Sequence, residues 1–255
     1  MKTKYLLYGL VAALLCACGS DDDDDASTAY TFEQAEVPTW RVDLTGNDEA
    51  PSWTAPDPAM FESSMFIMVK LQDELAPYST ADDRLTVFIG DECRAVPAEP
   101  NRDEDGNVFF VLKIRGNSTD RSVHFMLCYY SAQLHQIFSL SGQESFASEL
   151  TYGVDEDFVP PLLKGCKKYP VQQQLTVNLP ANVPFTPADG DIIAAFVGND
   201  CRGVGRVGQP FTVFRTTSDE TLQLRYYSTV QAGFYRLLQT LTMNEDEEQV
   251  VTLGF

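Results

Sequence analysis

Apolar and polar residues alternate along several stretches of the chain between residue 65 and the C-terminus. The alternation is clearest over 67–71, 175–179 and 222–226. A period of two is typical of strands with one buried face. Residues 192–197 are apolar at every position, which predicts a central strand covered on both faces. No helical period follows residue 60, so the pattern predicts an all-β fold.

The chain also contains an internal repeat. The segment 83–96 aligns without gaps to 191–204, and the alternating strands before and after it align as well. Five pairs of identical residues mark the motif: Asp83 with Asp191, Phe88 with Phe196, Gly90 with Gly198, Cys93 with Cys201, and Arg94 with Arg202. A repeat of this length indicates a duplicated module.

Each copy of the repeat predicts a tight hairpin and a sandwich. Asp91-Glu92 and Asn199-Asp200 lie between two strands at equivalent places, and asparagine and aspartate favour turns. Several short strands separated by turn signals are typical of β-sandwiches. Pro160 and Pro161 cannot donate to a strand ladder and mark a boundary near residue 165. We therefore expect two tandem immunoglobulin-like β-sandwich modules, residues 65–165 and 166–255.

The first 17 residues have the pattern of a lipoprotein signal peptide. Lys2 and Lys4 precede an apolar run, which ends in Leu15-Cys16-Ala17-Cys18. The run is shorter than the roughly 20 residues that span a bilayer, which disfavours a transmembrane helix. Cleavage before a lipid-modified cysteine needs small residues upstream, so Cys18 is the predicted lipidated N-terminus. We therefore expect a protein attached to a membrane through its N-terminal lipid.

Residues 18–32 are predicted to be an acidic, flexible tether. Five adjacent aspartates, Asp21 to Asp25, repel one another and favour a solvated spacer. With Gly19-Ser20 they resemble the acidic export signal of surface-exposed lipoproteins of the Bacteroidetes. This resemblance implies an outer-membrane protein that faces the cell exterior. Residues 33–64 are predicted to be an extension that packs on the first module, with residues 40–44 as an extra strand.

The repeated module resembles an uncharacterised sandwich repeat of secreted and surface proteins of the Bacteroidetes. The resemblance rests on Asp-x-x-x-x-Phe-x-Gly-x-x-Cys-Arg, which the second copy matches better than the first. Thr86-Val87 and Ala95 in the first copy depart from the pattern. The resemblance implies a fold and a surface location. It implies no known activity and therefore no catalytic residues.

The net charge of the chain narrows the classes of molecule that it can bind. Removing Lys2 and Lys4 with the signal peptide leaves 16 basic against 37 acidic residues, so the net charge of −19 becomes −21. Such a surface repels phosphate backbones, which argues against nucleic acid as a partner.

We expect Cys93 and Cys201 to be free and buried in separate cores, since they are equivalent in the two copies. Four cysteines outside the signal peptide still allow three disulfide connectivities.

Few residues have the spacing that catalysis or metal binding requires. Arg94 and Arg202 are expected to pair with carboxylates of their own module, and the alternative is that each arginine binds a ligand.

The segment 101–107 has oxygen ligands at alternate positions, as a calcium-binding loop has. Leu112 stands where such a loop requires a glutamate, which favours a polar hairpin loop over a calcium site. His124 and His135 have no partners at zinc or triad spacing. We expect no enzyme activity, no cofactor and no metal.

Aromatic residues are the better candidates for recognition. If Leu222, Leu224 and Tyr226 face the core, Tyr227 faces outward, and the same parity places Tyr130 outward. Exposed rings can stack on sugar faces, and Trp40 and Trp53 are further candidates, with packing at a sheet edge as the alternative. By analogy with multi-sandwich surface lipoproteins that capture polysaccharides, we expect a glycan-binding protein. The alternative is an adhesin or assembly protein without a sugar ligand.

Overall fold

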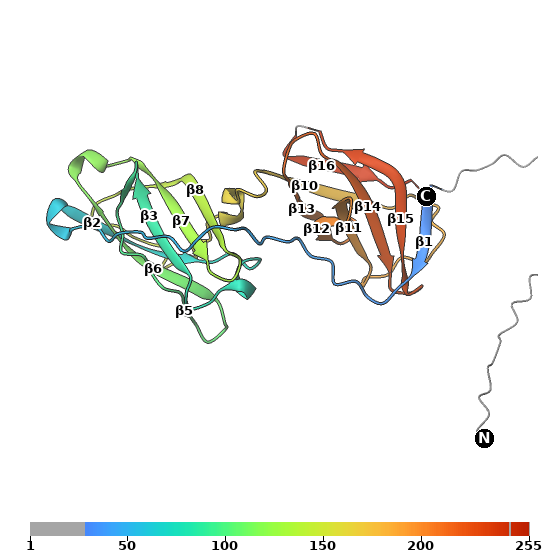
Figure 1. Ribbon diagram of the computed structural model, residues 1–255, viewed down its shortest axis with the longest axis horizontal. Helices are drawn as coiled ribbons and strands as arrows, with labels where there is room; N and C mark the ends of the chain where they lie inside the picture. Colours follow the sequence, from blue (N-terminus) through green and yellow to red (C-terminus); the bar gives the residue numbers. More distant parts are fainter. Residues whose placement is uncertain (1–28, 245, 255) are drawn as a thin grey trace, which may run out of the picture.

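The computed structural model describes residues 29–244 and 246–254. In this part of the chain the prediction of an all-β protein is confirmed, and the helices are four 3-10 turns of three or four residues. The strands form four sheets, which are gathered in two lobes (Figure 1). No helix of the described residues is long and apolar enough to cross a membrane. Cys18 and the rest of residues 1–28 lie outside the described part.

The first lobe contains two four-stranded sheets with the orders β5-β6-β2-β9 and β4-β3-β7-β8. Its strands are β2 (Ser63–Lys70), β3 (Arg84–Ile89), β4 (Glu92–Cys93), β5 (Asn101–Arg102), β6 (Val108–Gly116), β7 (His124–Ser131), β8 (Gln136–Ser145) and β9 (Thr151–Tyr152). Its 3-10 turns are η1 (Pro58–Met60), η2 (Ala76–Tyr78), η3 (Ser118–Asp120) and η4 (Leu162–Gly165).

The second lobe contains a five-stranded sheet, β1-β15-β14-β11-β12, and a three-stranded sheet, β13-β10-β16. Its strands are β1 (Tyr30–Gln34), β10 (Val171–Asn178), β11 (Ile192–Val197), β12 (Asp200–Gly205), β13 (Pro210–Arg215), β14 (Thr221–Ser228), β15 (Gly233–Thr242) and β16 (Glu248–Thr252). The strand β11 lies between β14 and β12, which is the interior position predicted for residues 192–197.

The two lobes share one strand order. The triplet β6-β2-β9 corresponds to β13-β10-β16, and in each triplet the last strand runs parallel to the middle one. The quartet β4-β3-β7-β8 corresponds to β12-β11-β14-β15, and all of these pairs are antiparallel. Each lobe then adds one strand, β5 in the first and β1 in the second. The repeat in the sequence therefore accompanies a repeat in strand order.

The motif forms a tight hairpin in both lobes. The strands β3 and β4 pair antiparallel across a two-residue turn, as do β11 and β12. Gly90 and Gly198 open these turns with φ angles of 60° and 61°. Glycine adopts positive φ without steric cost, so each turn begins one residue before the predicted Asp91-Glu92 and Asn199-Asp200.

Each lobe encloses its own hydrophobic core, and the two cores nearly meet. The core of the first lobe extends past the expected boundary at residue 165, because Cys166 and Tyr169 belong to it. Phe214 on β13 of the second lobe also packs in this core, and its ring centroid lies 5.8 Å from that of Tyr169. The connection between the lobes is therefore packed against both of them.

The cysteines of the described residues are free thiols. Cys128 and Cys166 are buried, whereas Cys93 and Cys201 are half-buried rather than fully enclosed as the sequence predicted. The reason is that both motif cysteines lie on β4 and β12, which are edge strands of their sheets. Burial nevertheless raises the pKa of the Cys201 thiol.

Residues 29–57, which we call the strap, run along both lobes. The strap begins as β1, which pairs antiparallel with the edge strand β15 of the second lobe. It continues without regular structure to the first lobe, as the blue trace in Figure 1 shows. There Gly46 N–H donates to Leu134 O and Asp48 N–H donates to His135 O, both at 2.8 Å.

The strap corrects three predictions for the N-terminal region. Residues 30–32, assigned to the flexible tether, lie in β1, and the extension packs on both lobes rather than on the first alone. Residues 40–44 form no strand. The physical reason is that the carbonyl of Asp43 accepts hydrogen bonds from the side chains of Lys168 and Tyr169 instead of joining a ladder.

Candidate functional site

Asp191 at the start of β11 is a buried hydrogen-bond acceptor, 4% exposed. Its carboxylate accepts bonds from the Tyr226 hydroxyl, from the N–H and hydroxyl of Thr229 at 2.7 Å each, and from Ala188 N–H at 2.8 Å. Burial pushes the pKa of Asp191 up, but these hydrogen bonds outweigh burial and hold the pKa below its usual value. The carboxylate ties the start of β11 to the end of β14.

Asp83 makes the same connection in the first lobe, where it is fully buried. It accepts bonds from the Tyr129 hydroxyl at 2.6 Å, from Ala132 N–H at 2.9 Å, and from Thr80. The aspartate of the repeated motif therefore has a structural partner in the tyrosine of the following strand. This arrangement explains why the motif opens on an aspartate.

The motif arginines each pair with a carboxylate of their own lobe. Arg94 Nη1 lies 2.6 Å from Asp120 Oδ2, and Arg202 Nη2 lies 3.0 Å from Glu220 Oε1. Both arginines are buried. An aromatic ring also covers each guanidinium, with centroid distances of 4.8 Å for Arg94 and 5.1 Å for Arg202.

Tyr130 and Tyr227 are buried, 5% and 2% exposed, so the expectation of exposed rings at these positions is wrong. Neither belongs to a core cluster, which agrees with the parity argument for the outer face of each sheet. The strap covers that face, however. Tyr227 lies opposite Phe234 on β15, and the ring of Trp40 packs on Phe234 with centroids 5.9 Å apart.

The two tryptophans of the strap occupy equivalent places in the two lobes. Trp40 packs edge-on against Phe196 with centroids 5.5 Å apart, and Trp53 packs edge-on against Phe88 at 6.3 Å. Phe88 and Phe196 are equivalent residues of the repeat. Both tryptophans are half-buried. The difference is that Trp40 lines two neighbouring cavities of the described part, and Trp53 lines neither of them.

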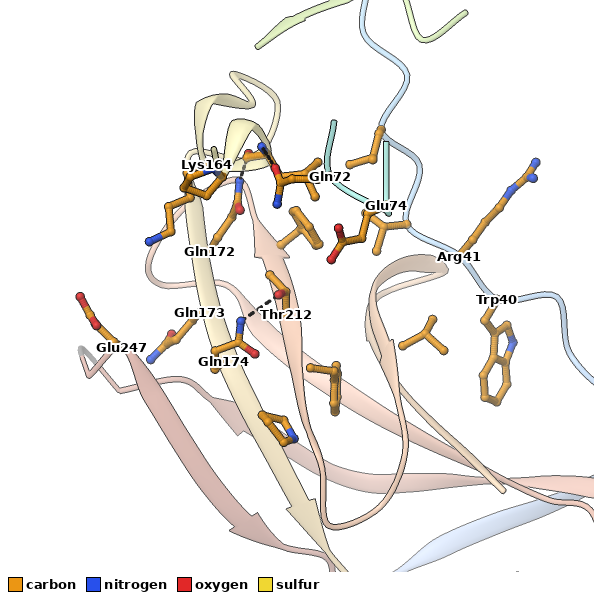
Figure 2. Close-up of a pocket in the computed structure, with 18 of the residues that line it drawn as sticks. Trp40, Arg41, Gln72, Glu74, Lys164, Gln172, Gln173, Gln174, Thr212 and Glu247 are labelled. Atoms are coloured by element: carbon orange, nitrogen blue, oxygen red, sulfur yellow. Dashed lines mark hydrogen bonds between the residues drawn. The ribbon is translucent and has the colours of Figure 1, made fainter. Parts of the chain in front are cut away.

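The larger of these cavities, which we call the interlobe groove, has a volume of about 790 Å³ and lies where the two lobes meet the strap. Trp40 and Arg41 of the strap form one wall, and the outer face of β10 and β13 forms the opposite wall (Figure 2). Gln72 and Tyr78 of the first lobe contribute to the lining. The groove therefore exists only because three separate segments of the chain come together.

Four glutamine side chains line the interlobe groove, beside the charged side chains of Arg41, Glu74, Lys164 and Glu247. Gln174 Nε2 donates to Thr212 Oγ1 at 2.9 Å, and Gln72 Oε1 accepts from Leu163 N–H at 2.9 Å. Gln172 Nε2 donates to the carbonyls of Leu163 and Tyr169. Gln72, Gln172 and Gln174 thus each have one end of the amide held by the protein and the other end without a partner among the described residues, whereas both ends of the Gln173 amide are bonded. Such groups can donate to or accept from a polar ligand.

A second cavity of about 460 Å³, which we call the Arg202 pocket, adjoins the groove at Trp40 and Arg41, since both residues line both cavities. Lys168 holds its wall in place: Nζ lies 2.8 Å from Asp43 O and 2.9 Å from Asp43 Oδ2. The hydrogen bond from Lys168 lowers the pKa of Asp43 to about 2. The side chain of Asp43 in the strap is therefore a carboxylate above about pH 4.

The remaining candidate residues lie away from both cavities. His124 and His135 are exposed. Residues 101–107 form β5 and the loop that connects it to β6, and the Asp103 carboxylate accepts hydrogen bonds from Asn107 N and Nδ2 at 2.8 Å each. The described residues contain no group of three or more histidine, cysteine, aspartate or glutamate side chains able to hold a metal ion.

Comparison with known proteins assigns no family to this chain. No protein-family model matches it, and no curated protein matches it. The geometry of the chain's own residues therefore carries the functional argument.

Sequence reasoning identified Trp40 but missed its neighbours in the cavities. Gln172 and Gln174 occupy outward-facing positions of a strand whose Leu175 and Val177 face the core. The alternation of apolar and polar residues could therefore have predicted that these two side chains point away from the core. Arg41 and Lys168 had no such signal, because nothing in a linear pattern brings the strap to the connection between the lobes.

Proposed function

We propose that the protein is a lipoprotein of the outer membrane, attached through Cys18 and facing the cell exterior. The basic start, the short apolar run and the small residue before Cys18 support this location, as does the acidic run that follows. The Cys18→Ser variant is expected to lose the lipid and leave the membrane fraction. Cell fractionation with mass spectrometry of the N-terminus measures both. A Cys18→Ser protein retained in the outer membrane would contradict the proposal.

The two lobes, in this proposal, are duplicated immunoglobulin-like sandwich modules. The shared strand order and the equivalent Asp–Tyr contacts support a duplication. The strap and the contact of Tyr169 with Phe214 hold the modules in one arrangement. A fixed arrangement favours a binding site at their junction, because little conformational freedom is lost when a ligand binds.

The function we propose is non-enzymatic glycan binding in the interlobe groove. The observation that carries it is a cavity of about 790 Å³ lined by a half-buried tryptophan and several amide side chains. Sugars present apolar ring faces and many hydroxyls, which suit aromatic rings and amides respectively. Trp40 supplies the ring, and Gln72, Gln172 and Gln174 supply amide groups.

Trp40→Ala is expected to weaken glycan binding by at least about tenfold, or roughly 1.4 kcal/mol, because it removes the tryptophan ring that lines the groove. A glycan array identifies the ligand, and isothermal titration measures the affinity of each variant. Trp53→Ala is the matched control, since Trp53 makes the equivalent contact with Phe88 but lines neither the interlobe groove nor the Arg202 pocket. Equal losses in the two variants, or no loss in either, would place binding elsewhere.

The alternative of an interaction protein has one observation in its favour. Phe66 on β2 and Val111 on β6 are 42% and 54% exposed, and they lie on neighbouring strands of one sheet. Exposed apolar side chains on a sheet face are typical of protein contacts. A protein that binds no glycan on the array would favour this alternative, with the Phe66 face as the surface to test.

A further inference from the structure

The duplicated motif allows a direct comparison of two equivalent arginines. In the first lobe, two carboxylates surround the Arg94 guanidinium. Asp120 binds Nη1 at 2.6 Å, and Glu92 Oε2 lies 3.1 Å from Nε as an ion-pair contact without hydrogen-bond alignment. In the second lobe, Arg202 contacts Glu220 through Nη2. Its Nε and Nη1 are buried and have no hydrogen-bond partner among the described residues.

The difference has a simple origin in the sequence. The residue equivalent to Glu92 is Asp200, whose side chain is one methylene shorter. No ion pair joins Asp200 to Arg202 in the described part of the chain. Burying the donors of a charged group without hydrogen-bond acceptors costs free energy. The environment of the Arg202 guanidinium therefore favours a ligand that carries a hydrogen-bond acceptor.

The Arg202 pocket lies at this place and has a cationic lining. Arg41, Lys168 and Arg202 contribute three positive charges, against Asp43 and Asp200. Asp43 is already paired with Lys168, with Nζ and Oδ2 2.9 Å apart. Arg41 is exposed and lines both this pocket and the interlobe groove, so it can reach a ligand in either. The lining therefore carries one more positive than negative charge on a chain with a net charge of −19, and Arg202 is also paired with Glu220.

We propose that the Arg202 pocket binds the carboxylate of a uronic acid, so that the glycan bound in the interlobe groove is an acidic polysaccharide. This inference rests on the proposed glycan-binding function and specifies its ligand. The carboxylate supplies a negative charge near the place that Glu92 occupies in the first lobe. Arg41 contacts it directly, and the Arg202 guanidinium stabilises it from the buried side. Carboxylates pair well with guanidinium groups because of their matching geometry.

A sugar carboxylate fits better than the acidic side chain of a polypeptide. The pocket adjoins the interlobe groove at Trp40, whose ring suits a pyranose face, and the amides of the groove suit its hydroxyls. The acidic surface of the protein opposes a polyanion at long range, but physiological salt screens this repulsion over about 8 Å. The contacts with Arg41 and Arg202 act within that distance.

The test compares polygalacturonate and alginate, two polyuronates, with fully methyl-esterified polygalacturonate, which has the same backbone without the charge. Isothermal titration of the full chain is expected to show binding of a polyuronate at least about tenfold tighter than binding of the ester, a difference of roughly 1.4 kcal/mol. Asp200→Glu is expected to remove this preference, because the longer side chain can pair with Arg202 as Glu92 pairs with Arg94. Glu92→Asp, the matched change in the first lobe, is expected to leave it unchanged.

The outcomes separate this inference from the proposed function. Equal affinity for polyuronate and ester, or an Asp200→Glu variant that keeps the preference, overturns the carboxylate site but leaves glycan binding in the groove intact. Binding of neither polyuronate also overturns the inference, and a glycan array without any ligand removes the proposed function as well. Tight binding of poly-L-glutamate without binding of a polyuronate overturns the inference in favour of an acidic polypeptide ligand.

Discussion

Asp191→Ala is expected to lower the free energy of unfolding by about 3–5 kcal/mol, because several donors lose their acceptor and each buried donor left unsatisfied costs about 1–3 kcal/mol. The substitution removes the acceptor for Tyr226, Ala188 and both donors of Thr229. The Tyr226 hydroxyl is buried and would be left without this partner, and a buried group that loses its hydrogen bond pays its desolvation cost. Urea denaturation followed by intrinsic fluorescence measures the change.

The control for this prediction lies two residues away. Asp189 is exposed, and its backbone carbonyl rather than its carboxylate binds Arg206. Asp189→Ala is therefore expected to change the unfolding free energy by no more than about 0.5 kcal/mol. A loss as small for Asp191→Ala as for Asp189→Ala would show that the motif aspartate contributes little to stability.

The same carboxylate predicts how stability depends on pH. Because the pKa of Asp191 is lowered in the folded protein, the unfolded chain binds a proton more readily than the folded one. The stabilisation is therefore complete above the ordinary value of 3.8 and is lost as the pH falls below it. We expect a smaller loss of stability below pH 4 in Asp191→Asn than in the parent protein.

Tyr169→Ala is expected to destabilise the protein by about 3–5 kcal/mol and to separate the unfolding of the two lobes. Tyr169 is 3% exposed, packs against Phe214 of the second lobe, and lies under the Arg202 guanidinium. Its hydroxyl donates to Asp43 O of the strap at 3.1 Å. Removing the ring therefore opens a cavity at the place where both lobes and the strap meet.

Differential scanning calorimetry measures the second part of this prediction. The parent protein is expected to unfold in one transition, whereas Tyr169→Ala is expected to show two, because the lobes keep separate cores. Tyr169→Phe keeps the ring and loses only the bond to Asp43, so we expect a loss of about 1 kcal/mol and a single transition. A single transition in Tyr169→Ala would show that the lobes are coupled elsewhere.

Local patterns in the sequence predicted much of the fold. Alternation and the apolar run at 192–197 predicted β-strands, and the gapless repeat predicted equivalent strands and hairpins in two places. These features depend on neighbours close in the chain: the side chains of a strand alternate between two faces, and a tight turn needs glycine or a similar residue within a few positions. The repeat also aligned Glu92 with Asp200, on which the proposed carboxylate site depends.

The candidate site depended on contacts between residues far apart in the chain. Parity placed Tyr130 and Tyr227 on the outer face of their sheets, but only the tertiary structure brings the strap over that face and buries them. The same strap carries Trp40 to the junction of the lobes, where it meets side chains more than a hundred residues away. The alternation of apolar and polar residues along a strand predicts on which face of the sheet each side chain lies. What covers that face is decided by the path of the whole chain, because burial depends on every segment that packs there.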